Sequence, residues 1–218
     1  MAYFMFIATG IRKASQIELI TTFRLLAAFG FFHGMTELVE WVRLVFRMAD
    51  MAEIKAFMYM SQGFLLVSFV ALLQFGVNLL TFKVGTKPLR YIPSVFLLAY
   101  VGFLSITGGV ENAFTLGRLG VRMLGFASAA ISGVVLIKFS AGLRPSGNGR
   151  LIKGFLYAGI GFVIFSAFAG LEKGTLLKMP FQFYRAVCAF AIAISSFYVV
   201  DVFKVKTCQK PEAGLENA

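Results

Sequence analysis

Six long apolar segments, separated by short polar connections, make up most of this chain of 218 residues. A helix needs about 20 predominantly apolar residues to cross the hydrocarbon core of a bilayer, and each segment is close to that length or longer. We therefore expect six full membrane spans. They comprise residues 21–46, 56–82, 90–107, 116–139, 151–171 and 180–203.

The composition favours a membrane protein over a soluble one. Hydrophobic residues make up 59% of the chain and charged residues only 14%, whereas soluble domains contain about 25% charged residues. A soluble protein of this size would lack the polar residues that its exterior needs. The expected fold is all-α: a polytopic transmembrane helix bundle over residues 1–206, followed by a short polar cytoplasmic tail over residues 207–218.

The N-terminal stretch, residues 1–11, is apolar but too short to cross a bilayer. It has no basic start, and the positive pair Arg12 and Lys13 follows the apolar run instead of preceding it, which argues against a signal peptide. We expect a partial or truncated first span in addition to the six full ones.

Basic residues are distributed unevenly between the two sides of the expected bundle. The connections after residues 1–11, 56–82 and 116–139, with the C-terminal tail, hold 13 of the 21 basic and 4 of the 10 acidic residues, a net charge of +9. The opposite side has a net charge of +2. Positive charge marks the cytoplasmic side, so we expect a multi-pass protein of the cell's inner membrane with a cytoplasmic C-terminus. This pattern explains the positive charge without a nucleic-acid partner.

The segment at residues 21–46 carries ionisable side chains that are costly within a membrane. His33, the only histidine of the chain, is followed by Glu37 and Glu40, and the spacing places all three on one face of a helix. Trp41, the only tryptophan, is expected towards the outer interface. Such ionisable groups usually face a bundle interior and have partners there.

Two arginines are expected at a similar depth. Arg122 and Arg185 each come early in a segment that starts on the outer side, so Glu37 or Glu40 is expected to pair with one of them. The candidate cluster comprises His33, Glu37, Glu40, Trp41, Gln62, Arg122, Gln182 and Arg185.

The cluster has several interpretations. It could be a charge network that fixes helix register, an outward-facing pocket for a small signal, a metal site or a proton relay. We expect no metal and no cofactor, because one histidine and no nearby cysteine make a weak ligand set. No catalytic motif is present, so we do not expect an enzyme.

Small residues recur at every fourth position within residues 116–139, at Gly125, Ala129 and Gly133. This spacing lets helices approach closely in lipid. Packing within the bundle is favoured over a dimer face. No internal repeat supports an inverted-repeat transporter.

The run LLAAFGFFHGMTELVEW at residues 25–41 resembles the signature LAAFGLLHGLxEW of a multi-helix membrane sensor region. That region, of about seven spans, stands at the N-terminus of bacterial histidine kinases and diguanylate cyclases. Residues 68–76, 122–125, 179–186 and 201–203 resemble its third helix, its fifth helix, the start of its last helix and its exit. The matching positions in 179–186 are Pro180, Gln182, Arg185 and Ala186.

The resemblance implies a sensor that takes part in signal transduction, but two features differ. The family has a complete first span, and its last span leads to a cytoplasmic output domain, whereas only residues 204–218 follow here. We therefore expect a stand-alone sensor-type module that acts through a separate kinase or cyclase, or as a homo-oligomer. The alternatives are a small transporter or permease-like bundle and a structural subunit of a membrane complex.

Overall fold

The computed structural model describes residues 17–48, 55–84, 91–106, 110–143, 149–169, 175–176 and 179–208. Within these ranges the chain forms six helices and a short hairpin between the last two. The elements are α2 (Ile17–Met48), α3 (Lys55–Val84), α4 (Ile92–Ile106), α5 (Val110–Gly142), α6 (Gly149–Ala169), β1 (Thr175–Leu176), β2 (Met179–Pro180) and α7 (Phe181–Cys208). The expected partial first span and residues 209–218 of the expected tail lie outside these ranges.

The all-α prediction is confirmed, and each of the six apolar segments corresponds to one helix. Pro180 was expected to open the last helix, but it lies in β2, paired with Thr175, and α7 begins one residue later. Proline has no N–H to donate, which suits the edge of a hairpin as well as a helix start.

Three helices contain stretches long and apolar enough to cross a membrane, in Lys55–Thr81, Gly117–Gly142 and Gly149–Ala169. The apolar stretches of α4 and α7, Ile92–Gly102 and Phe183–Phe197, are shorter, and α2 is not among the candidates. The fold is therefore an all-helical bundle with three candidate spans, and six full spans are not confirmed.

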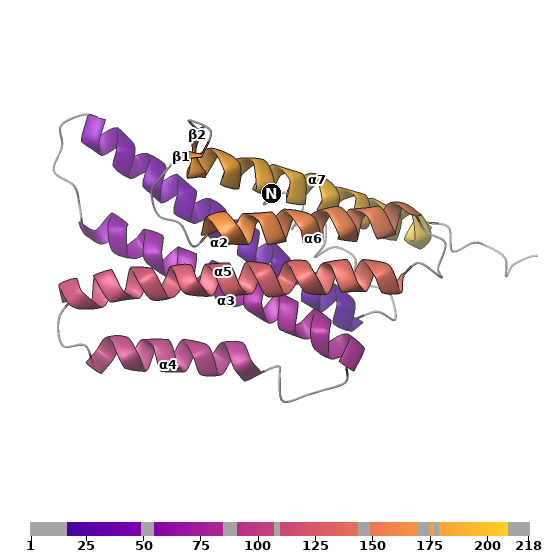
Figure 1. The fold of residues 1–218 in the computed structure, drawn as a ribbon, viewed down its shortest axis with the longest axis horizontal. Coiled ribbons are helices and arrows are strands. Elements are labelled where there is room, and N and C mark those ends of the chain that lie inside the picture. Colours follow the sequence, from indigo (N-terminus) through magenta and orange to yellow (C-terminus); the bar gives the residue numbers. More distant parts are fainter. Residues whose placement is uncertain are drawn as a thin grey trace, which may run out of the picture.

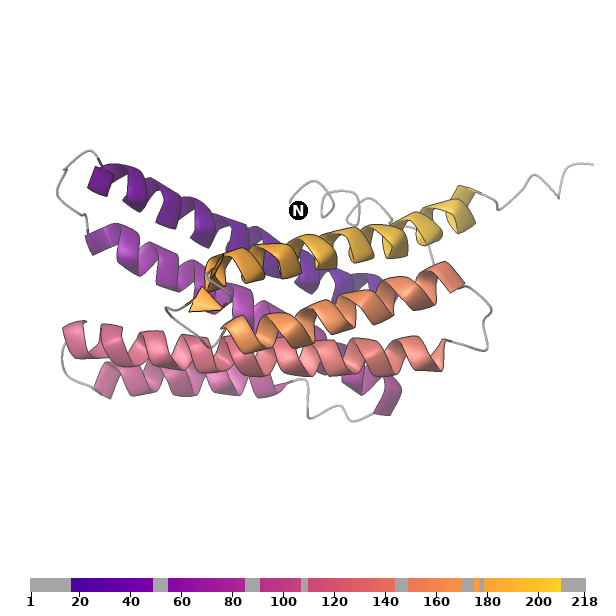
Figure 2. The same ribbon diagram turned by 45° about the horizontal axis from the view of Figure 1, so that its top comes forward.

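Consecutive helices run in opposite directions along the long axis of the molecule (Figure 1). Helix α5 packs against α3 and α6, α3 also packs against α2, and α6 packs against α7. Helix α4 lies at the edge of the bundle, where its Tyr100 hydroxyl donates to the carbonyl of Gly117 at 2.8 Å. The turned view shows α7 crossing in front of α2, on the side away from α4 (Figure 2).

Helices α5 and α6 meet at two glycines that face each other. A Cβ atom on Gly133 would lie 2.7 Å from the carbonyl oxygen of Gly159, and a Cβ atom on Gly159 would lie 2.8 Å from that of Gly133. Ala129, one turn away, is fully buried. The small-residue stripe of α5 thus packs within the bundle, as predicted.

Helices α3 and α5 run in the same direction and pack in step. Phe69 of α3 lies against Gly125 of α5, and seven residues further along each helix Gly76 lies against Ser132. The hydroxyl of Ser132 also donates to the backbone carbonyl of Leu72 at 2.9 Å. The two contacts are seven residues apart on both helices. Residues of α3 and α5 that lie equally far along the chain from one of these contacts therefore lie at the same level of the bundle.

Buried hydroxyl groups in the bundle are satisfied largely by their own helices. Five of the buried serines donate to a carbonyl three or four residues earlier, at 2.7–3.2 Å: Ser68, Ser128, Ser140, Ser166 and Ser195. On α3, the amide of Gln74 donates to that of Asn78 at 2.8 Å. Such local bonds let small polar residues fill tight helix contacts without unsatisfied groups.

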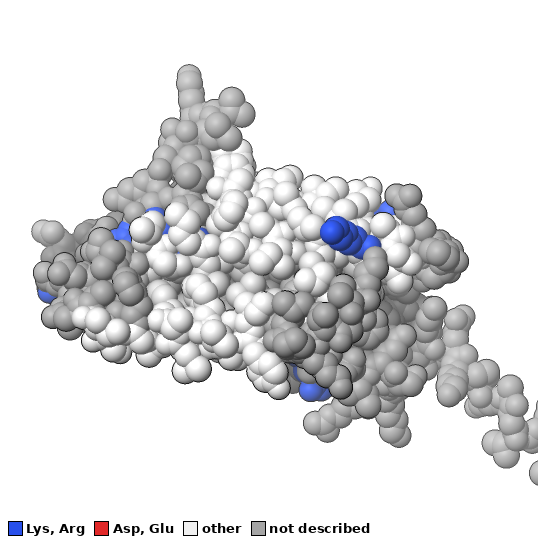
Figure 3. All heavy atoms as spheres, turned by 60° about the horizontal axis from the view of Figure 1, so that its bottom comes forward, with Lys and Arg blue, Asp and Glu red and all other residues white. Residues whose placement is uncertain are grey.

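The outer surface of the bundle is apolar over much of its length. Large hydrophobic side chains are exposed on all six helices, including Leu98, Phe190 and Met123. Figure 3 shows a broad band of uncharged residues across the visible face, with lysine and arginine near its two ends. Exposed apolar surface of this extent is typical of a protein that contacts lipid.

The glycine contact between α5 and α6 predicts a loss of stability in Gly133→Ala. The new methyl group would meet the backbone of Gly159 and Val163, which cannot move aside as a side chain could. We expect a loss of about 1–3 kcal/mol, seen as a lower Tm of the purified protein in detergent. The control is Gly102→Ala in α4, where no atom lies within 4 Å of the new Cβ. Equal Tm values for the two variants would contradict this packing.

Candidate functional site

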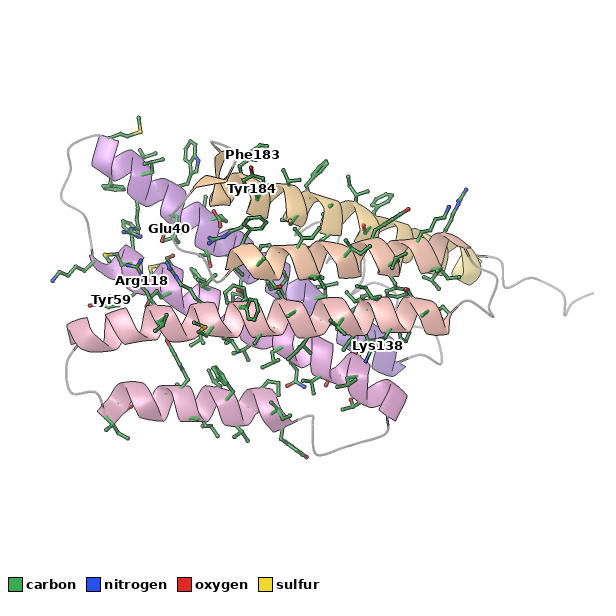
Figure 4. The ribbon with its side chains drawn as sticks, in the orientation of Figure 1. Glu40, Tyr59, Arg118, Lys138, Phe183 and Tyr184 are labelled. Atoms are coloured by element: carbon green, nitrogen blue, oxygen red, sulfur yellow. The ribbon has the colours of Figure 1, made fainter. Side chains whose placement is uncertain are left out.

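Helix α2 carries its ionisable side chains in its C-terminal half. His33, Glu37 and Glu40 follow one another at helical spacing and so lie along one side of α2. This half of α2 lies at the end of the bundle where α3, α5 and α7 begin, which we call the cluster end. Figure 4 shows Glu40 and Arg118 towards this end, whereas Lys138 of α5 lies towards the other.

Glu40 is bound by its own helix and by α3. One terminal nitrogen of Arg43 lies 2.8 Å from each of its carboxylate oxygens, and the Ser61 hydroxyl donates to one of them at 2.6 Å. The Arg43 side chain is only 13% exposed, so the pair holds it against the helix surface. Glu40 therefore uses partners other than Arg122 and Arg185.

Glu37 and Arg185 connect α2 with α7. Their charges interact electrostatically, although Glu37 is exposed and Arg185 is half-buried. The Nε of Arg185 also donates to the carbonyl of Phe168 at 2.9 Å, and the Phe168 ring stacks on Tyr184 with ring centres 5.1 Å apart. Because α6 ends at Ala169, Arg185 supplies a donor and a positive charge to a helix end that favours both.

His33 lies one turn deeper in the bundle than Glu37, among aromatic rings. Its ring centre is 5.3 Å from that of Phe29, 5.8 Å from that of Phe69 and 5.7 Å from that of Phe165. These rings come from α2, α3 and α6 and form an apolar floor beneath the charged groups. The Nδ1 of His33 is buried and has no hydrogen-bond partner among the described residues.

Gln62 belongs to the same level of the bundle as the arginines of α5. Phe69 of α3 lies against Gly125 of α5. Gln62 precedes Phe69 by seven residues, and Arg118 precedes Gly125 by seven residues. Because α3 and α5 run in the same direction, Gln62 lies level with Arg118. Arg122 lies one turn deeper. The Nε2 of Gln62 is buried and, within the described part of the chain, has no hydrogen-bond partner.

Positive charges converge at this level. Arg122 is half-buried, and its charge interacts with those of Arg118 on its own helix and Arg185 on α7. The charge of Arg185 also acts on His33. We call His33, Glu37, Gln62, Arg122 and Arg185 the polar cluster.

The remaining predicted site residues are placed differently. The polar cluster contains five of the eight candidates. Glu40 is held by Arg43 and Ser61, and Trp41 is 68% exposed on the surface of α2. Gln182 lies in the first turn of α7, but its side chain falls outside the described residues.

The sequence reasoning missed several residues that shape the site. The i, i+3 spacing of Glu40 and Arg43 is a signal for an ion pair on one helix, and it was available from the sequence. The contact between Ser61 and Glu40 and the aromatic floor under His33 depend on how α2, α3 and α6 cross, which no spacing within one segment reveals.

The described residues contain no group of three or more His, Cys, Asp or Glu side chains placed to hold a metal ion. His33 faces aromatic rings. Glu40 already binds Arg43 and Ser61. The three residues aligned on α2 thus have three different surroundings.

Known proteins do not add to the description of this cluster. Comparison of the chain with protein-family models, curated proteins and solved structures found no match. None of these comparisons links the chain to the sensor region of histidine kinases and diguanylate cyclases, so its function has to be inferred from its own residues.

The electrostatic interaction between α2 and α7 predicts energetic coupling between Glu37 and Arg185. In a double-mutant cycle of Glu37→Gln and Arg185→Gln, we expect a coupling free energy of about 1 kcal/mol by equilibrium unfolding in detergent, because each substitution removes the same charge interaction. Glu37→Gln combined with Lys138→Gln is the matched control and should be additive, since Lys138 lies towards the other end. A Glu37–Arg185 cycle as additive as the control would exclude the pairing.

Proposed function

We propose that this chain is an integral membrane sensor-type module that binds a small signal molecule in the polar cluster. It passes the signal to a separate protein, such as a kinase or cyclase, or to a second copy of itself. The polar cluster faces the outside of the inner membrane, and the opposite end of the bundle, with the C-terminus, faces the cytoplasm.

The observation that carries this proposal is the pair of buried polar atoms without partners. Nδ1 of His33 and Nε2 of Gln62 come from different helices, and neither has a hydrogen-bond partner in the described part of the chain. Leaving a buried donor or acceptor unsatisfied costs about 1–3 kcal/mol, so such groups are rare and need an explanation. A ligand that enters between α2, α3 and α5 would satisfy them.

The charged members of the cluster support access and binding. Glu37 is an exposed residue at this level of the bundle. Arg185 and Arg122 contribute donors from two further helices. A ligand held here would contact α2, α3, α5 and α7 together, which is the arrangement that lets binding favour one helix packing over another.

Helix α7 offers a route from the cluster to the other end of the bundle. Arg185 lies in its second turn, and the helix continues without interruption to Cys208. Its 28 residues correspond to a length of about 42 Å, more than the hydrocarbon thickness of a bilayer. A change in the surroundings of Arg185 would therefore move a helix that ends near the expected cytoplasmic surface.

The membrane and its orientation are supported by two observations. Three helices have the length and composition to cross a bilayer, and large apolar side chains cover the outside of the bundle. The net charge of +9 expected at the end opposite the cluster favours a cytoplasmic location for that end.

Native mass spectrometry tests the proposed function. The protein is extracted in a mild detergent, and small molecules retained by the wild type are compared with those retained by Gln62→Leu. We expect a compound that the wild type retains and the variant loses. Identical spectra would refute a ligand site at Gln62, and uptake of that compound into proteoliposomes would favour a transporter instead.

The unpartnered amide of Gln62 also predicts an unusual stability effect. Replacement with leucine, of similar size, removes a buried unsatisfied group, so Gln62→Leu should raise the stability of the ligand-free protein by about 1–3 kcal/mol. Thermal unfolding after extensive detergent washing measures this change. Gln74→Leu is the matched control on the same helix, and it should lower the Tm because Gln74 donates to Asn78. A lower Tm for Gln62→Leu would mean that the amide is part of the structural packing.

A further inference from the structure

We infer that the ligand of the polar cluster is an uncharged flat ring of the quinone class, with a carbonyl group at each end. It is held between His33 of α2 and Gln62 of α3, above the apolar floor, and it is bound and released unchanged. This inference rests on the proposed function and specifies the chemical class of the ligand.

Pairs of aromatic rings separate α2 from α6. The two helices run in the same direction, and three ring pairs follow one another in step along both. Rings in contact at such distances hold their helices apart, whereas α5 and α6 meet backbone to backbone at their facing glycines. The pairs, with ring centres 5.8, 5.9 and 5.7 Å apart, are Phe23–Phe155, Phe29–Phe162 and His33–Phe165.

The series of ring pairs ends at His33 and Phe165 within the described part of the chain. One turn further on, α2 has Glu37 and α6 ends at Ala169. The ring of Phe168 stacks on α7 instead. A methyl group and a flexible carboxylate side chain do not replace a pair of rings, although the helices keep the separation set below. A flat ring from outside the chain therefore fits this level as the next member of the series.

Gln62 borders the same level from α3. The bond of 2.6 Å from Ser61 to Glu40 fixes the level of α3 against α2. Because Gln62 follows Ser61, the rise of a helix places it about 9 Å from the level of His33. Gln62 also lies two turns before Phe69, on the same side of α3, and the Phe69 ring centre is 5.8 Å from that of His33. The amide and the imidazole thus lie on one interior side of the bundle, at its two levels.

The two unpartnered atoms define the polar groups of the ligand. Nδ1 of His33 and Nε2 of Gln62 are buried, and neither has a hydrogen-bond partner among the described residues. An amide nitrogen only donates, and Nδ1 of a neutral imidazole donates when it carries the ring hydrogen. A ring with a carbonyl oxygen at each end accepts from both, and with a hydrogen bond of about 3 Å at either end it spans a distance of this order.

The test uses the full chain in maltoside micelles with duroquinone as the probe. Durene, the same methylated ring without the two oxygen atoms, is the matched control compound. The methyl groups of duroquinone occupy every free ring carbon, so it resists addition of thiols such as that of Cys188. The Tm is measured by size-exclusion chromatography after heating. We expect duroquinone to raise the Tm in a saturable manner and durene to leave it unchanged.

Variants at the two polar atoms locate the binding. His33→Phe keeps a ring in the aromatic layer and removes Nδ1, and Gln62→Leu removes Nε2. Each should raise the Kd of duroquinone about three- to tenfold, because each removes one hydrogen bond. Gln74→Leu makes the same change further along α3 and should keep the Kd of the wild type while lowering the Tm. If one of the two site variants does not fold, the other provides the measurement.

Three results would overturn the inference. Duroquinone fails to raise the Tm, durene raises it equally, or either site variant binds duroquinone as tightly as Gln74→Leu does. A compound that native mass spectrometry shows to depend on Gln62 and that has no ring would also overturn the quinone class, and it would leave the proposed function intact.

Decylubiquinone, which carries an alkyl tail, distinguishes the two sources of a quinone. A lower Kd than that of duroquinone identifies a quinone dissolved in the bilayer, and a higher Kd identifies a soluble one. Either result supports the quinone class, provided that the Kd rises in His33→Phe and Gln62→Leu.

Discussion

The close approach of α5 to its neighbours is the contact on which the rest of the bundle depends. Without side chains at Gly125 and Gly133, α5 accepts the Phe69 ring of α3 and the backbone of α6 at Gly159. In lipid, helices gain little from excluding water and associate mainly through such tight packing. Helix α5 therefore holds α3 and α6 at fixed positions, and α2 and α7 pack onto these two helices.

This packing explains why the polar residues meet. The stripe of small residues that brings α5 against α3 also sets the level of Arg122 relative to Gln62. On the other side, α6 ends where Arg185 can bind the carbonyl of Phe168, and this bond brings the guanidinium of α7 towards Glu37. Contacts between apolar surfaces thus position the polar and charged groups of the cluster.

The sequence predicted the helices and much of the candidate site, because both depend on signals within single segments. Apolar runs of spanning length identified all six helices, and the spacing of His33 and Glu37 identified one face of α2. The level of Arg185 followed from its distance to the start of its segment. These inferences need only the regular rise and turn of a helix.

What the sequence could not predict depends on how segments cross. Glu40 was one of two carboxylates considered as partners for an arginine on another helix, but Arg43 lies on the same helix and pairs with it at lower entropic cost. The hairpin before α7 pairs Thr175 with Pro180, which an apolar pattern does not encode. The aromatic surroundings of His33 come from rings on three helices, which no pattern within one segment encodes.

The equal spacing of contacts along α3 and α5 has a consequence for motion within the bundle. Phe69 fits against Gly125 and Ser132 fits against Gly76, so sliding one helix by a turn would break both contacts at the same time. The two helices form a rigid core that resists shear, and α6 is fixed to it through Gly133 and Gly159. Helices α2 and α7, which contribute His33, Glu37 and Arg185, pack onto this core through α3 and α6.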